Sequence, residues 1–149
     1  MLRITSDGRK LGLDQRIINP MLPDESETKV NKCVANILKI WKEGDSEKLT
    51  QLVFCDIATP SGKPAGDSEN APFTNIYDDI RRKLISGGMA SEQIAFIHNA
   101  KTDIQKKELF AKVRSGQVRV LIGSTQKMGA GTNVRRTGRT ASCGLRQRT

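Results

Sequence analysis

The sequence of 149 residues predicts an α/β fold in which helices flank a parallel sheet in three layers. Three short apolar segments, at 49–57, 93–98 and 118–123, have the length and composition of buried strands. Before and between them, apolar residues recur every three or four positions, as in amphipathic helices. Because strands that alternate with helices form parallel sheets, we expect one domain built around a single sheet.

The first 23 residues are expected to form an N-terminal extension. Asp7-Gly8 is a turn signal between two apolar stretches, 2–5 and 11–18. Pro20 and Pro23 then interrupt the chain.

The first helix is expected to follow, and Asp24 or Ser26 can cap it. Its apolar face runs from Val30 to Trp41, and Gly44 ends it. The first strand follows at 49–57. Residues 58–72, rich in Pro, Gly, Ser and Asp, are expected to be a loop.

Two more helices are expected, one before each of the remaining strands. The third has the Thr and Gln spacing of a capping box, in which side chain and backbone bond reciprocally. The expected caps and ends are Thr74 or Asn75 and Gly87 for the second helix, and Thr102, Gln105 and Gly116 for the third.

The charge is positive, at +9, and unevenly distributed. Residues 135–149 hold five arginines and no acid, so 20 basic and 16 acidic residues remain, a net +4. Such a balance is typical both of phosphate-binding proteins and of ordinary domains. Cys33, Cys55 and Cys143 are far apart and lack metal-ligand spacing, so we expect free thiols, no bound metal and a cytoplasmic protein with no membrane contact.

Binding groups are expected in the loops that leave the carboxyl ends of the strands, at Asp56, His98 and Ser124. The segment 124–133, STQKMGAGTN, is expected to be a loop. Its paired glycines, hydroxyls and lysine can offer donors to phosphate or sugar oxygens. A tight turn without a ligand accounts for the same residues.

The stretch QIAFIHNAKT…KKELFAKVRSGQVRVLIGSTQKMGAGTN resembles motifs IVa to V in the second, C-terminal RecA-like lobe of superfamily 2 helicases. LVFCDIATP, at 52–60, resembles motif IV. The subgroup that is most similar consists of helicases of phages and mobile elements, which are related to Swi/Snf-type translocases and DEAD-box helicases. The resemblance covers residues 24–134 and implies a RecA-like fold of the P-loop NTPase class.

The resemblance also implies roles for individual residues. Motif V touches the nucleic-acid backbone and the nucleotide between the lobes, and the two preceding strand ends face the tracked strand. The implied nucleic-acid contacts are Phe54, Asp56, His98, Asn99, Lys101, Thr125, Lys127 and Thr132, and the implied nucleotide contacts are Gly129, Gly131 and Asn133. Simpler roles remain open: Phe54 and Cys55 as core residues, His98 as a loop residue bonded to backbone, and Lys127 as a solvated side chain.

A helicase motor also needs a phosphate-binding loop, G-x-x-x-x-G-K-(S/T), which belongs to the first lobe. The nearest sequence is Gly62-Lys63-Pro64, where proline cannot replace the magnesium-binding hydroxyl. The chain is therefore expected to be an inactive part of an ATP-dependent hydrolase. In the intact parent, ATP and Mg²⁺ would bind between this lobe and a first RecA-like lobe of the same or a partner chain, with DNA or RNA as the tracked strand.

The range 135–149 is expected to be a basic tail without regular structure. Its start, RRTGRT, is similar to motif VI, which carries an arginine finger. The further strand and helix that precede motif VI in the family are not visible in the sequence, so Arg136 and Arg139 are not assigned that role. A frameshift or truncation, or a native basic arm, accounts for this range.

Two other hypotheses stay open. The chain could be a stand-alone α/β nucleic-acid-binding module without motor activity. It could also be a small enzyme with a site at the strand ends, using Cys55 as a nucleophile or pairing Asp56 with His98.

Overall fold

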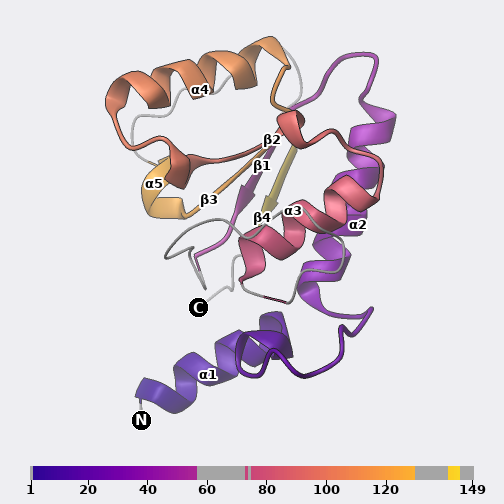
Figure 1. Cartoon of the computed structure of the whole chain (residues 1–149), viewed down its shortest axis with the longest axis vertical. Helices are drawn as coiled ribbons and strands as arrows, with labels where there is room; N and C mark the ends of the chain where they lie inside the picture. Colours follow the sequence, from indigo (N-terminus) through magenta and orange to yellow (C-terminus); the bar gives the residue numbers. More distant parts are fainter. Residues whose placement is uncertain (1, 57–72, 74, 130–140, 145–149) are drawn as a thin grey trace.

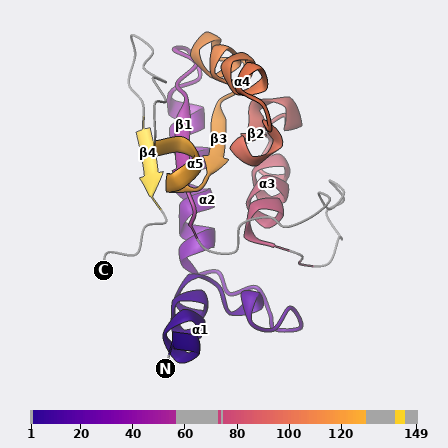
Figure 2. The same cartoon turned by 90° about the vertical axis from the view of Figure 1, so that its left-hand side faces the viewer.

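Four parallel strands in the order β2-β3-β1-β4 form the centre of the structure (Figures 1 and 2). This computed structural model describes residues 2–56, 73, 75–129 and 141–144. The strands are β1 (Gln51–Phe54), β2 (Ile94–Phe96), β3 (Val120–Gly123) and β4 (Ala141–Gly144). The predicted α/β class and parallel sheet are confirmed. The predicted loop 58–72 and cap Thr74 lie outside the described residues.

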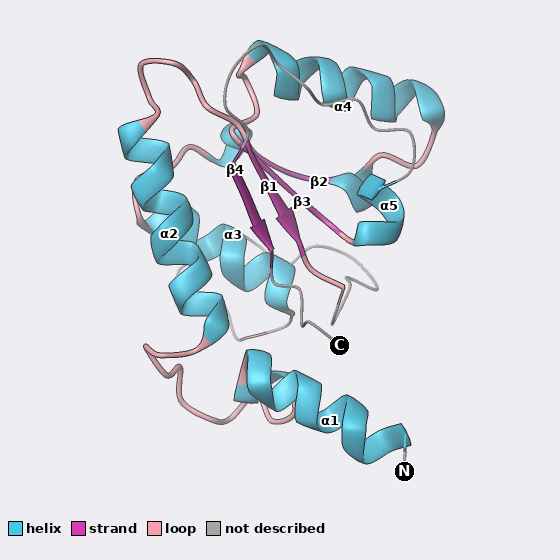
Figure 3. Ribbon diagram, turned by 180° about the vertical axis from the view of Figure 1, so that it is seen from behind, coloured by secondary structure: helices cyan, strands magenta, loops and turns pink. Residues whose placement is uncertain are grey.

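Helices cover both faces of this sheet because the side chains of each strand alternate between faces (Figure 3). On one face, Val53 and Cys55 of the β1 segment pack in a core with α2 (Lys29–Glu43) and α3 (Ile76–Ser86). On the other face, Leu52 and Phe54 pack with residues of α4 (Asp103–Ser115) and α5 (Thr125–Gly129).

The helix ends follow local chemistry. Thr102 and Gln105 form the predicted capping box of α4, and Gly116 ends that helix in the left-handed conformation, at φ 82°. Asn75 caps α3 as predicted. The prediction of Asp24 or Ser26 as the cap of α2 is wrong.

Thr28 caps α2 instead, by accepting a hydrogen bond from the Asn31 backbone N–H at 3.2 Å. Asp24 is committed elsewhere, with its carboxylate 2.6 Å from Nζ of Lys83 and 3.1 Å from Arg16. Asp24 is thus engaged in ion pairs with other segments, and Thr28 is the residue that caps the helix.

The structure differs from the sequence-based expectation in three other segments. A continuous helix, α1 (Leu2–Leu13), runs through the predicted turn at Asp7-Gly8, because one exposed helical glycine costs only about 0.5–1 kcal/mol. Thr125–Gly129 form α5 and not a loop. Residues 141–144, expected to lack regular structure, form β4 beside β1.

The first turns after α1 are joined to the body by buried charges. Arg16, in the short turn Gln15–Ile17, is 5% exposed and lies 2.6 Å from Asp14 and 2.8 Å from Asp79 of α3. Its guanidinium also lies 4.7 Å from the ring centre of Phe73. Since Leu13 is buried in the core of α2 and α3, residues 13–17 belong to the packed body.

Candidate functional site at the carboxyl ends of the strands

The carboxyl ends of β2, β3 and β1 lie side by side at one edge of the sheet. Phe54 is paired with Gly123, and Phe96 with Ile122. Parallel pairing therefore brings together the segments that follow, which carry most of the predicted contacts. We call Asp56, His98, Thr125 and Lys127 the carboxyl-edge site.

Asp56 joins the end of β1 to the start of α5. Its Oδ1 accepts a hydrogen bond from the Thr125 backbone N–H at 2.6 Å, and its Oδ2 accepts one from the Thr125 hydroxyl at 2.8 Å. Both carboxylate oxygens are thus occupied by the same residue. Asp56 is placed to hold the segment after β3, although the sequence had it among the direct contacts.

Helix α5 forms because Ser124 and Met128 stabilise its two ends. The carbonyl of Ser124 accepts hydrogen bonds from the backbone N–H groups of Lys127 and Met128 at 3.1 and 3.0 Å. Met128 is 4% exposed and packs in the core beneath α4. Thr125 is half-buried and Lys127 is exposed to solvent, so Lys127 is a cation beside the strand ends.

His98 lies in the turn Ile97–Asn99 that follows β2. Its ring meets Tyr77 edge-on, with 5.3 Å between ring centres, and its buried Nδ1 has no hydrogen-bond partner among the described residues. Burial lowers the pKa of His98, and the positive charge of Lys127 adds to that effect. The neutral imidazole is therefore favoured. The alternative role, a loop residue bonded to backbone, finds no support at Nδ1 among the described residues.

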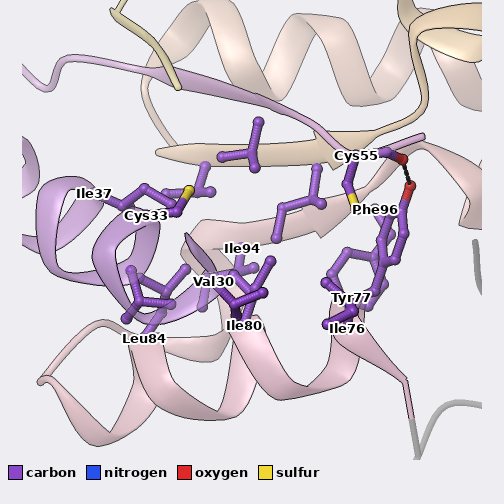
Figure 4. Close-up of a cluster of buried hydrophobic side chains, with 14 of the residues drawn as sticks. Val30, Cys33, Ile37, Cys55, Ile76, Tyr77, Ile80, Leu84, Ile94 and Phe96 are labelled. Atoms are coloured by element: carbon purple, nitrogen blue, oxygen red, sulfur yellow. Dashed lines mark hydrogen bonds between the residues drawn. The ribbon is translucent and has the colours of Figure 1, made fainter. Parts of the chain in front are cut away.

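Tyr77 of α3 lies beside Cys55 and Phe96 in the core between the sheet and helices α2 and α3 (Figure 4). Its hydroxyl donates a hydrogen bond to the Cys55 carbonyl at 2.5 Å, and its ring meets Phe96 edge-on at 5.7 Å. Burial, reinforced by the nearby Cys55 and Asp56, raises the pKa of the Tyr77 hydroxyl. The hydroxyl therefore stays protonated and holds α3 against the end of β1.

Some of the remaining predicted site residues are exposed to solvent and others are buried in the core. Asn99 and Lys101 are exposed at the end of β2, and the Lys101 backbone N–H bonds to the Gln105 side chain at the start of α4. Phe54 is half-buried in the core on the α4 and α5 face. Cys55 is fully buried, which favours its interpretation as a core residue over that of a nucleophile.

Most of the glycine-rich end of the motif V-like segment lies outside the described residues. Gly129 is the last residue of α5. Gly131, Thr132 and Asn133 lie outside the described residues, as do Arg136 and Arg139.

Gly123, which the sequence analysis did not single out, shapes this edge. A Cβ atom there would collide with the Ile97 side chain and crowd Met128. The sequence signal was present, because Gly123 ends an otherwise branched apolar strand. The glycine lets the turn after β2 and helix α5 pack directly on the end of β3.

In the parts of the chain that the structure describes, no three His, Cys, Asp or Glu side chains are grouped to hold a metal ion. Within the same residues, no helix has both the length and the apolar character needed to cross a membrane. The chain matches no protein-family model, no curated protein and no solved structure.

Proposed function

We propose that this chain acts as the C-terminal RecA-like lobe of an ATP-dependent nucleic-acid helicase or translocase. The observation that carries the proposal is the meeting of three strand ends, those with motif IV-, IVa- and V-like sequences, at one edge of a parallel sheet. In open parallel sheets, ligands bind outside the carboxyl ends of the strands. ATP and Mg²⁺ would be bound jointly with a first lobe, which carries the phosphate-binding loop.

The geometry supports separate roles for the residues of this edge. Lys127 and Lys101 are exposed and positively charged, so they are suited to contact the phosphates of a DNA or RNA strand. Asp56 is a positioning residue, because it holds Thr125 and the start of α5. Contacts to phosphate are independent of base sequence, as a translocating motor requires.

The test is the binding of a fluorescent single strand, and of the same sequence as a duplex, to the full chain over a salt series. We expect the variant K101A/K127A to bind more weakly and its salt slope to fall by about 1.4–1.8, or 0.7–0.9 for each lost phosphate contact. The matched control is K39A/K42A, which removes two exposed lysines from α2.

The control is expected to retain the salt slope of the natural sequence. An equal loss in the two double variants would mean that binding depends only on overall charge, and the proposed contact edge would be wrong. No binding by the natural sequence at low salt would overturn the proposal as well.

A further inference from the structure

His98 is the single histidine of the sequence, and it lies at the carboxyl edge of the sheet. The turn that carries it packs on the end of β3 and on α5, the helix of Lys127. Histidine is the side chain whose charge ordinarily changes between about pH 5 and 8. A proton on His98 would therefore add a second cation beside Lys127 in the carboxyl-edge site.

The two ring nitrogens of His98 differ in their surroundings. Nδ1 is enclosed and has no hydrogen-bond partner among the described residues. Nε2 makes no hydrogen bond within the described residues either, but it is not enclosed, and the side chain as a whole is half-buried. Nε2 is thus the atom through which His98 can exchange a proton with solvent and donate to a ligand.

The groups that face His98 come from the elements packed around its turn. Helix α5 contributes the positive charge of Lys127, and α3 contributes the ring of Tyr77, which meets the imidazole edge-on at 5.3 Å between ring centres. Strand β3, Val120–Gly123, contributes no titratable side chain, because its residues are apolar or glycine. Asp56 belongs to the same edge, but both of its carboxylate oxygens already accept hydrogen bonds.

These surroundings disfavour a proton on His98 in the free chain. Burial lowers the pKa of His98, and repulsion by Lys127 adds to that effect. A phosphate group held by Lys127 would reverse the second cause, because its negative charge offsets the ammonium and attracts the imidazolium. An opposite charge within about 4–6 Å favours the charged form of a titratable group. Phosphate binding and protonation of His98 should therefore favour each other.

We propose that His98 makes nucleic-acid binding at the carboxyl-edge site proton-linked: as an imidazolium, it joins Lys127 in holding a phosphate of the bound strand and donates to it through Nε2. The inference rests on the proposed function and adds a regulation to it, since affinity then depends on pH as well as on salt. Because coupling between two ligands is reciprocal, the strand strengthens proton binding at His98 by the same factor by which the proton strengthens strand binding.

The first test follows the pKa of His98 by NMR in the isotope-labelled full chain, where a single histidine gives a single set of imidazole signals. The chain is titrated free and in complex with a single-stranded oligonucleotide, at one ionic strength because phosphate contacts depend on salt. The pKa is expected to be higher in the complex by about one, which is a tenfold change in proton affinity.

Two variants check the part of Lys127 in this shift. K127A should raise the pKa of His98 in the free chain, because the repulsion is removed, and should reduce the further rise on binding. The matched control K39A removes an exposed lysine from α2 and should leave both pKa values as they are in the natural sequence.

The second test measures the affinity for the fluorescent single strand between about pH 5.5 and 8, the range in which histidine titrates. The natural sequence should bind more tightly at the acidic end, by up to about tenfold, the limit set by a pKa that is one higher in the complex. H98Q keeps a side chain that can donate a hydrogen bond but gains no charge, so its affinity should be nearly independent of pH. Circular dichroism at each pH checks that the fold is retained.

The outcomes separate this inference from the proposed function. Binding whose affinity does not change with pH, together with an unchanged pKa of His98, would overturn the proton linkage and leave the proposed helicase lobe standing. A pH dependence that persists in H98Q would assign the proton to another group and overturn the role of His98. A natural sequence that does not bind the strand at any pH, even at low salt, would overturn both.

Discussion

The two ends of the sheet use polar residues in opposite ways. At the amino ends of the strands, Arg119 is 1% exposed, and its side chain bonds to three backbone carbonyls and to Asp45. At the carboxyl ends, Asp56 and Lys127 are exposed, and His98 has a buried ring nitrogen without a partner among the described residues.

The two ends differ in whether their hydrogen-bond donors are already used within the fold. Arg119 bonds to the carbonyls of Leu49, Trp41 and Gly44, which are acceptors at the end of α2 and before β1. A cation at the C-terminus of a helix is favourable. Here the guanidinium of Arg119 is bonded to groups of the protein itself and does not face solvent. At the carboxyl ends, Lys101 and Lys127 are exposed to solvent, so the proposed function is located there and not at the amino ends, where the charge of Arg119 is buried.

The largest expected effect is at the amino end. Arg119→Met should lower the free energy of unfolding by about 3–5 kcal/mol, because three carbonyls lose their buried donor. Urea denaturation followed by circular dichroism measures it. The control Asp45→Asn, at a partner that is 73% exposed, should cost less than about 1 kcal/mol. A loss of similar size in both variants would contradict the structural role of Arg119.

A steric change at the carboxyl end should come next. Gly123→Ala is expected to cost about 1–3 kcal/mol, since the added methyl group collides with Ile97 and crowds Met128. Thermal unfolding reports the loss. Gly8→Ala is the matched control: it lies in α1 with nothing near the added methyl group, and should stabilise by about 0.5–1 kcal/mol. Tolerance of alanine at 123 would show that the edge packs loosely.

Removal of one hydroxyl tests how α3 is held to this edge. Tyr77→Phe should cost about 1–2 kcal/mol, because the buried Cys55 carbonyl loses its hydrogen bond while the ring remains. Chemical denaturation gives the value. An unchanged midpoint would mean that this contact adds nothing to stability.

A smaller effect is expected at Asp56. Asp56→Ala should lower stability by about 1 kcal/mol and speed hydrogen exchange at the Thr125 amide, which loses its acceptor. Glu108→Ala removes an exposed acid from α4 and serves as the charge-matched control. Unaltered exchange at Thr125 would contradict a positioning role for Asp56.

The smallest expected effect is a dependence of stability on pH. The folded-state pKa of His98 lies below its ordinary value of about 6.5, so near that pH the unfolded chain binds more protons than the folded one. Stability should therefore decrease as the pH falls through about 6.5. His98 is the single histidine of the sequence, so His98→Gln should flatten the stability curve between about pH 5.5 and 7.5. A curve that keeps its slope would refute this assignment.

Local patterns predicted those features that depend on residues close together in the sequence. The capping box of Thr102 and Gln105 and the left-handed Gly116 follow from contacts within a few residues, and the structure confirms them. The N-cap of α2 does not, because Asp24 is drawn to Lys83 and Arg16, which come from other parts of the chain. Helix α5 was missed for a related reason, since Met128 is held by a core built from α4 and the sheet.

In the carboxyl-edge site too, some features follow from the local sequence and others depend on contacts between distant segments. That Asp56, His98 and Ser124 follow strands was readable from the sequence, and parallel pairing brings those ends together. The sequence did not show which of these side chains remain available to bind a ligand. The bonds from Thr125 to Asp56, and the contact of Tyr77 with His98, join residues far apart in the chain.

By itself, the sequence determined the α/β class, the alternation of helices and strands from α2 to β3, and the helix ends formed by local hydrogen bonds, because apolar periodicity and capping act over a few residues. Only the tertiary structure decided the burial of Arg16 and Arg119 and the strand at 141–144. Burial and ion pairing depend on which distant segments meet. That information is spread over the whole chain and becomes visible only once it has folded.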